Sequence, residues 1–432
     1  MTEVLPRRVR VGYGLGSVAT GSFGTVPGLL LLPYLTDRLG ITAAVAGLMV
    51  FLPKAWDVVL NPIAGRISDR STSPAGRRRP FLVRAGLALA VLFAIMFAGP
   101  TSPTVIAGGW VLLFFLACAS AYAFFQVPYV AMPAELTDDY DERTRLMTWR
   151  VAILALAILI SGGLSPVIRD WAGYRVVGIF VGLLIAVGAL AAWRGTDGAP
   201  THEVVGAGGS LRDQLRVVWA SRPFRHLITT FVLQALATGV MLAGVDYVAR
   251  SVLRDKGMSS VLFVCFVGPA LLVTPLWQRY AEHRDKRRGY LISSVLLGGG
   301  AVLAFAGMHL GAVVAALAVA VVGVGYAGAQ MFPMAMLPDV AAADARTSGE
   351  NRIGVFTGVW TAGETLGLAL GPFVYAAVLA LGGYVSSTDG LAAQSDSAVT
   401  AIGLGFTVLP AVSVACSLFF LTRYRLGRQE PA

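Results

Sequence analysis

Long runs of apolar residues, separated by short polar connections, follow one another along almost the whole chain. Val11–Tyr34, Ala85–Gly99 and Val313–Gly328 are examples. A run of roughly 18 or more apolar residues is long enough to cross a hydrocarbon layer about 30 Å thick. Backbone groups in lipid must be paired within the segment, which favours helices, and the short alternating segments of a β-barrel are not visible.

The runs predict twelve membrane-spanning helices. They cover residues 10–34, 42–66, 80–99, 104–131, 149–168, 175–194, 226–250, 257–279, 289–308, 311–334, 353–381 and 398–421. A long polar stretch after the sixth span divides them into two sets of six. We therefore predict an all-α polytopic membrane protein with a six-helix bundle at 1–194, a linker at 195–225 and a second bundle at 226–432.

Short motifs recur at corresponding places in the two halves. The second span ends in Asn61-Pro-Ile-Ala-Gly-Arg66, and the eighth ends in Thr274-Pro-Leu-Trp-Gln-Arg279. In the same way, Gln126-Val-Pro128 in the fourth span corresponds to Gln330-Met-Phe-Pro333 in the tenth. Repeated halves around a site near the membrane midplane are typical of secondary transporters. The repeats thus predict two pseudo-symmetric bundles.

The composition agrees with this interpretation, because 56% of the residues are hydrophobic and only 13% are charged. A soluble domain usually carries about 25% charged residues. The net charge of +10 lies mostly in the connections. Cytoplasmic loops of membrane proteins have this bias, so no nucleic-acid partner is needed to explain it. Arginine-rich and arginine-poor connections alternate along most of the chain, although basic residues also occur on the predicted outer side, at 169–175 and at 250–256. The alternation predicts an inner-membrane protein whose termini and linker are all cytoplasmic.

Several other classes of function lack the residues that they need. The three cysteines are not spaced as a metal or redox pair, and the four histidines are too few to suggest a metal centre. The glycines of Gly12–Gly16 follow no strand, so they indicate close helix packing rather than a nucleotide loop. We expect no metal, no cofactor and no enzymatic activity.

Charged residues inside spans are costly and are therefore candidates for function. Lys54, Asp57 and Asn61 lie on one face of the second span, at i, i+3 and i+7. Asp57 could take and release a proton, Lys54 could tune its pKa, and Asn61 could offer a carbonyl oxygen. The alternative is a structural Lys54–Asp57 ion pair. Sodium would require more negative charge, so the trio favours a proton or no coupling.

A second set of polar and aromatic residues is the predicted substrate site between the halves: Gln126, Tyr122, Arg150, Trp360 and Glu364. Trp360 precedes Glu364 by one turn, so the two could present an indole and a carboxylate to a ligand. Alternatively, Glu364 is buried and pairs with Arg150 or with the lysine of the second span. Tyr122 and Gln126 share a helix face, where hydrogen bonding between helices is the alternative role.

A third set is predicted to form a cytoplasmic gate. It consists of Asp69, Arg70, Arg77, Arg78, Arg79, Glu135, Arg143, Asp339 and Arg346. An acid at a helix end that faces a basic cluster can latch two halves and bias one conformation. Part of the arginine cluster could instead meet anionic lipid, at about 1 kcal/mol per charge. A solvated loop is expected for the acidic run, with Glu135 as its candidate member of the latch: Glu135, Asp138, Asp139, Asp141 and Glu142.

Three stretches carry a family resemblance: Lys54–Gly65 with its Trp-Asp and Asn-Pro pairs, Ser68–Pro80, and Pro338–Arg352. They resemble the major facilitator superfamily and, within it, the glycoside–pentoside–hexuronide:cation symporters, the group of the melibiose permease. The second stretch is also similar to plant sucrose carriers. The resemblance extends over the layout of the whole chain. It implies alternating access by twelve helices and symport of a sugar or glycoside with a cation.

The sequence departs from the family pattern at the positions that would bind sugar and cation. Asn61 stands where the family often has a second acid, and the acids that hold sugar in the melibiose permease align with Gly21 and Gln126. The lysine of the eleventh helix falls near Gly363 or Glu364, whereas the arginine that opens the fifth helix is retained as Arg150.

We therefore predict a secondary active transporter of a small polar solute, a sugar or glycoside, that is coupled to protons rather than to sodium. Its partners are the solute, the proton and membrane lipids. The alternative is a lipid-handling protein or assembly factor that uses the same fold without sugar transport.

Overall fold

The computed structural model describes residues 5–71, 73, 76–137, 139–199, 219–348, 353–390 and 392–426. Most of the predicted linker, Asp138 and residues 349–352 of the third motif lie outside this part of the chain. Within it, the secondary structure is helical, and 12 helices are long and apolar enough to cross a membrane. The predicted fold class and number of spans are confirmed.

By their contacts the residues form two compact units, Met1–Gly206 with Ser386–Ala392, and Ala207–Val385 with Ala393–Ala432. The helices of the first unit are α1 (Arg7–Val26), η1 (Pro27–Leu31), α2 (Leu32–Asp37), α3 (Ala43–Asp69), α4 (Arg79–Ala98), α5 (Thr104–Ala131), α6 (Pro133–Leu136), α7 (Tyr140–Ala172) and α8 (Tyr174–Gly195). Those of the second are α10 (Arg222–Tyr247), η2 (Val248–Val252), α11 (Met258–His283), α12 (Lys286–Leu310), α13 (Ala312–Ser348), α14 (Ile353–Leu381) and α15 (Asp396–Arg423).

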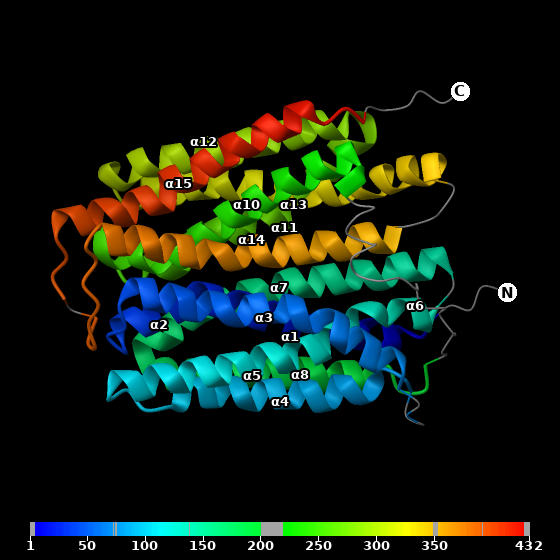
Figure 1. Ribbon diagram of the computed structural model, residues 1–432, viewed down its shortest axis with the longest axis horizontal. Coiled ribbons are helices and arrows are strands. Elements are labelled where there is room, and N and C mark those ends of the chain that lie inside the picture. The colour runs from blue at the N-terminus through cyan, green and yellow to red at the C-terminus, as the bar shows by residue number, and fades with distance from the viewer. Residues whose placement is uncertain are drawn as a thin grey trace. The chain divides into compact units, whose positions relative to one another are not determined.

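The two units repeat the same pattern of helix packing (Figure 1). In the first unit, α1 packs against α7 and α8, α5 packs against α3 and α4, and α4 packs against α8. In the second unit, α10 packs against α14 and α15, α13 packs against α11 and α12, and α12 packs against α15. The equivalent spans thus have equivalent neighbours, which confirms the two pseudo-symmetric bundles.

Two helices extend well beyond their apolar runs. The carboxylate of Asp139 accepts the N–H of Glu142 at 2.9 Å, and this cap starts α7 before the predicted span 149–168. The helix α13 continues through Pro333 and Pro338 to Ser348, although we expected its span to end at 334. Membrane helices tolerate proline because neighbouring groups satisfy the freed backbone. Hydropathy identifies the apolar part of a helix and misses such polar extensions.

Glycines allow the closest helix contacts in each unit. A Cβ on Gly12 of α1 would overlap Gly195 of α8, and a Cβ on Gly371 of α14 would overlap Gly239 of α10. Large aliphatic side chains such as Leu272, which is 80% exposed, cover the outside of the helices. An apolar surface of this kind is suited to lipid.

Candidate coupling and substrate site

The helix α3 carries Lys54, Asp57 and Asn61 on one face, as predicted. The Asp57 side chain is only 5% exposed. Its Oδ1 atom is buried and has no hydrogen-bond partner in the part of the chain that the structure describes. Lys54 and Asn61 are partly exposed. A buried carboxylate with an unused oxygen is costly to keep unless a ligand or a proton occupies it.

The Lys54 side chain turns toward aromatic rings rather than toward Asp57. Its Nζ lies 4.8 Å from the centre of the Phe23 ring and 5.9 Å from that of Tyr122. The two rings are themselves in contact, with centroids 4.5 Å apart. A cation over aromatic faces is stabilised without a carboxylate. Among the described residues, no ion pair joins Lys54 to Asp57. Lys54 therefore does not neutralise the Asp57 carboxylate by direct contact.

In α5, Gln126 lies one helical turn after Tyr122, and its side chain is half-buried. Arg150 of α7 places its guanidinium carbon 5.7 Å from the centre of the Tyr129 ring. The Tyr129 hydroxyl donates to the carbonyl of Tyr13 at 2.8 Å, so this ring is fixed. The Nε atom of Arg150 is buried without a partner among the described residues. The first unit thus offers a carboxylate and a guanidinium that each have an unused hydrogen-bonding atom, together with the half-buried amide of Gln126.

The second unit has a related polar cluster. Glu364 of α14 forms a side-chain hydrogen bond with Gln330 of α13, and Gln330 forms another with Tyr326. Tyr326 and Gln330 are one turn apart, as are Tyr122 and Gln126 in the equivalent helix α5. In the sequence, Gln330 stands out only as the counterpart of Gln126 in the repeat, and Tyr326 is not predicted as a site residue. The signal that could have found it is the repeated Tyr-x-x-x-Gln spacing in the fourth and tenth spans.

Trp360 lies differently from what we expected. It is 1% exposed, and its ring stacks on Phe231 of α10 with the ring centres 4.2 Å apart. Packing two aromatic faces between α14 and α10 buries more apolar area than an open indole would. In this conformation Trp360 is therefore a packing residue that positions α14 rather than an open platform for a ligand. Pairing of Glu364 with Arg150 or Lys54 remains a prediction.

The predicted gate residues of the first unit form a compact ion-pair cluster within that unit. Arg78 contacts Asp69 at 3.0 Å and Glu135 at 2.7 Å, and Arg77 lies 4.0 Å from Glu135. Arg79 contacts Asp197 at 2.7 Å. Arg78 and Glu135 are buried, whereas Asp69 is half-exposed. The contacts join the end of α3 to the start of α4 and to α6.

The remaining gate residues of this unit have more local roles. Arg143 donates to the carbonyl of Thr137 at 3.0 Å, and Arg70 is exposed. The acidic run is not simply a solvated loop, because Glu142 is 2% exposed and contacts Arg145 at 2.6 Å. The cause is the early start of α7, which places Glu142 in its first turn, where a carboxylate is favourable. Asp138 is outside the described residues.

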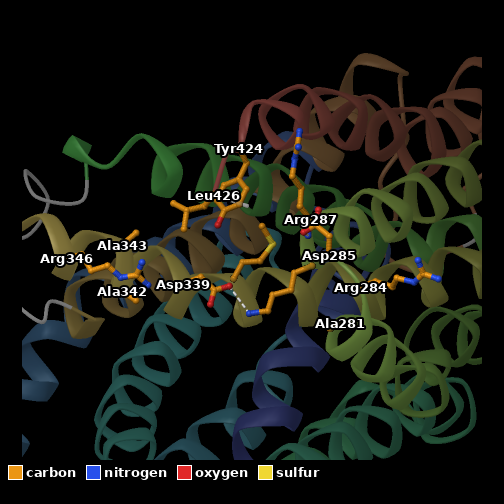
Figure 2. Close-up of a pocket in the computed structure, with 12 residues that line it drawn as sticks. Ala281, Arg284, Asp285, Arg287, Asp339, Ala342, Ala343, Arg346, Tyr424 and Leu426 are labelled. Atoms are coloured by element: carbon orange, nitrogen blue, oxygen red, sulfur yellow. Dashed lines mark hydrogen bonds and ion pairs between the residues drawn. The ribbon is translucent and has the colours of Figure 1, made fainter. Parts of the chain in front are cut away.

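In the second unit, Asp339 and Arg346 line a cavity of about 330 Å³ (Figure 2). Lys286, which the sequence analysis did not single out, contacts Asp339 at 2.7 Å. Burial raises the pKa of the Tyr424 hydroxyl in this cavity, and the nearby carboxylates of Asp339 and Asp285 raise it further. Tyr424 thus stays protonated at neutral pH. The Lys286–Asp339 pair joins the start of α12 to the polar extension of α13.

Among the described residues, no three or more His, Cys, Asp or Glu side chains come together in a group that could hold a metal ion.

Comparison with known proteins agrees with the geometry. Residues 12–428 match the sequence model of a family described as MFS/sugar transport protein. An uncharacterized symporter of Synechocystis is 26% identical over 99% of this chain and 95% of its own. The glucuronide carrier protein homolog of Escherichia coli is 25% identical over 90% of this chain and 86% of its own. The isoprimeverose transporter of Lactiplantibacillus pentosus is 23% identical over 99% of this chain and 91% of its own.

Solved structures show the same fold. A bacterial homolog to the human lysosomal transporter Spinster, inward-facing and unoccupied, superimposes with a TM-score of 0.69 at 14% identity over 98% of both chains. The nucleoside transporter NupG gives a TM-score of 0.69 at 14% identity over 96% of this chain and 98% of its own.

Proposed function

Because the chain belongs to the family described as MFS/sugar transport protein, we propose that it moves a sugar or glycoside together with protons by alternating access. The observation that carries the coupling is the state of Asp57. It is a buried carboxylate in a membrane helix with one oxygen unused, while the neighbouring lysine is held by aromatic rings. An acid of this kind can accept a proton in one conformation and release it in the other.

A hydroxyl-rich substrate suits the polar groups of both units. Each unit provides an amide one turn after a tyrosine, Gln126 after Tyr122 and Gln330 after Tyr326, and the second adds the carboxylate of Glu364. Amide and carboxylate groups can hydrogen-bond sugar hydroxyls, and tyrosine rings can pack on the apolar face of a sugar. Relatives that are named for glucuronide and isoprimeverose support this substrate class.

The choice of proton over sodium rests on the charges around Asp57. Sodium prefers several hard oxygen ligands and a negative site, but Asn61 is neutral and Lys54 is positive. A proton needs only one titrating acid. We therefore propose that Asp57 alone takes up and releases the coupled proton, while Asn61 is a neutral hydrogen-bonding neighbour.

The proposed orientation places both termini and the linker in the cytoplasm of the cell that carries this inner-membrane protein. The Arg78 cluster then lies on the cytoplasmic side, where we propose that it favours the outward-facing state. Single cysteines at Glu282 and at Asp389, both exposed, test the orientation after the three native cysteines are replaced. Glu282→Cys should resist an impermeant thiol reagent added outside, and Asp389→Cys should react. The reverse pattern contradicts the orientation.

The substrate class is tested by thermal unfolding of the purified protein with a panel of sugars, glycosides and lysolipids. A ligand that binds the native state raises its stability by about 2.7 kcal/mol at 100 times its Kd. We expect a shift with a sugar or glycoside. A shift with lysolipids alone would favour the lipid-handling alternative. Uptake into proteoliposomes under a pH gradient, compared with a sodium gradient, then identifies the coupling ion.

A further inference from the structure

The last described residues of the chain separate two cavities of the second unit. After α15 ends at Arg423, the backbone is extended at Tyr424, with φ −68° and ψ 121°. Successive side chains of an extended segment point to opposite sides. Tyr424 and Leu426 accordingly line the cavity of Figure 2, whereas Arg423 and Arg425 line a second one.

The second cavity, which we call the arginine cavity, is strongly basic. It has a volume of about 500 Å³ and is lined by Arg222, Pro223, Arg225, His226, Arg423 and Arg425. No acidic residue of the described chain lines it, and none of its four arginines has an ion-pair partner there. The cavity in Figure 2 differs, because its basic residues are accompanied by Asp285 and Asp339.

The four arginines are exposed, and the positive charge that they share favours an anion over a neutral ligand. Four guanidinium groups repel one another when they line one space, and the start of α10 adds the partial positive charge of a helix N-terminus. The arginine bias of cytoplasmic loops explains how many arginines are present, but not why they converge from α10 and α15 on a cavity without acids. Planar guanidinium groups pair with phosphate oxygens through two parallel hydrogen bonds.

The surroundings of the arginine cavity favour a phosphate that belongs to a lipid. Trp219, shortly before α10, is 58% exposed, and Phe419 of α15 is 51% exposed. The guanidinium carbon of Arg423 lies 3.9 Å from the centre of the Phe419 ring. Exposed aromatic side chains beside basic ones are typical of the level of lipid headgroups.

We propose that the arginine cavity binds a phosphate group, and that the phosphodiester of an anionic phospholipid occupies it. The guanidinium groups would hold the phosphate oxygens, and the acyl chains would follow the exposed apolar side chains of α15, such as Val408 and Val412. The site is independent of the proposed sugar transport, since none of its residues belongs to the coupling or substrate clusters.

The test is lipid binding to the purified, delipidated full-length protein, measured by native mass spectrometry. The protein is titrated with phosphatidylglycerol, with phosphatidylcholine and with inorganic phosphate. The site variant is Arg225→Gln with Arg425→Gln. The matched control is Arg279→Gln with Arg288→Gln, which removes the same charge from exposed positions that do not line the cavity.

We expect the wild type and the control to bind phosphatidylglycerol saturably and at least about tenfold more tightly than phosphatidylcholine. The site variant should bind phosphatidylglycerol at least about tenfold more weakly than the wild type does. Arg225→Lys with Arg425→Lys, which keeps the charge, should lose affinity partially and serves if the glutamine variant does not fold. If the protein binds inorganic phosphate saturably and only the site variant loses this binding, the phosphate site is supported. Its ligand would then be a soluble phosphate rather than a lipid. Equal losses in site variant and control, or no saturable binding, would overturn the proposal.

Discussion

The ammonium group of Lys54 lies 4.8 Å from the centre of the Phe23 ring, although Asp57 is only one turn further along the same helix. The ring belongs to α1, so the lysine is drawn across to a neighbouring helix. Asp57 keeps a buried oxygen without a partner among the described residues. This relationship keeps the ammonium group out of direct ion-pair contact with a potential coupling acid, although the two charges still interact across the space between them.

Phe23→Leu should impair proton-driven uptake, because it removes the nearer of the two rings that contact the Lys54 ammonium group. The lysine is then free to pair with Asp57. A cation–π contact of about 1–2 kcal/mol corresponds to a loss of roughly 5- to 30-fold in initial rate. The control is Phe93→Leu, since Phe93 also contacts Phe23, with centroids 6.1 Å apart. Equal losses in both variants would mean that only packing was disturbed.

Glu135→Gln should destabilise the protein much more than Asp69→Asn, although both acids contact Arg78. Glu135 is buried with the arginine, so its removal leaves Arg78 only the solvent-screened contact with Asp69, at a cost of about 3 kcal/mol. The Asp69 side chain is 52% exposed, and its loss should cost no more than about 1 kcal/mol. Thermal unfolding of the two variants checks the order. Similar losses would contradict the structural role assigned to the Arg78–Glu135 pair.

Gln330→Leu should lower both the stability and the sugar affinity of the protein, because Glu364 loses its hydrogen-bond partner. A buried acceptor without a partner costs about 1–3 kcal/mol. Adding Glu364→Leu should restore stability without restoring the sugar-induced thermal shift. If Gln330→Leu alone keeps both properties, the cluster of α13 and α14 does not contribute to the site.

The twelve spans and the repeat of two halves could be predicted because apolar runs and repeated motifs are local features of the sequence. The packing function of Gly12 and Gly371 could be predicted for the same reason, since a small residue within a membrane helix allows close approach. The polar extension of α13 could not, because its stability past Pro338 does not depend on hydropathy.

The details of the site depend on which neighbouring helix each side chain faces. Spacing alone places Lys54 beside Asp57, but only the position of α1 shows that Phe23 takes the lysine. The same limit explains Trp360, whose ring turns to Phe231 of α10. It also explains Glu142, which becomes buried because α7 starts early.

The measurement that tests the central claim most directly compares two transport modes of Asp57→Asn in proteoliposomes, with the sugar or glycoside that stabilises the wild type most. Asp396→Asn, at an exposed position in the first turn of α15 and outside the coupling, substrate and gate residues, is the matched control. Concentrative uptake needs a net proton cycle, whereas counterflow exchanges substrate without one. We expect Asp57→Asn to abolish uptake driven by a pH gradient but to retain counterflow, and Asp396→Asn to retain both. If Asp57→Asn still concentrates substrate, or if a sodium gradient alone drives the wild type, proton coupling through Asp57 is wrong.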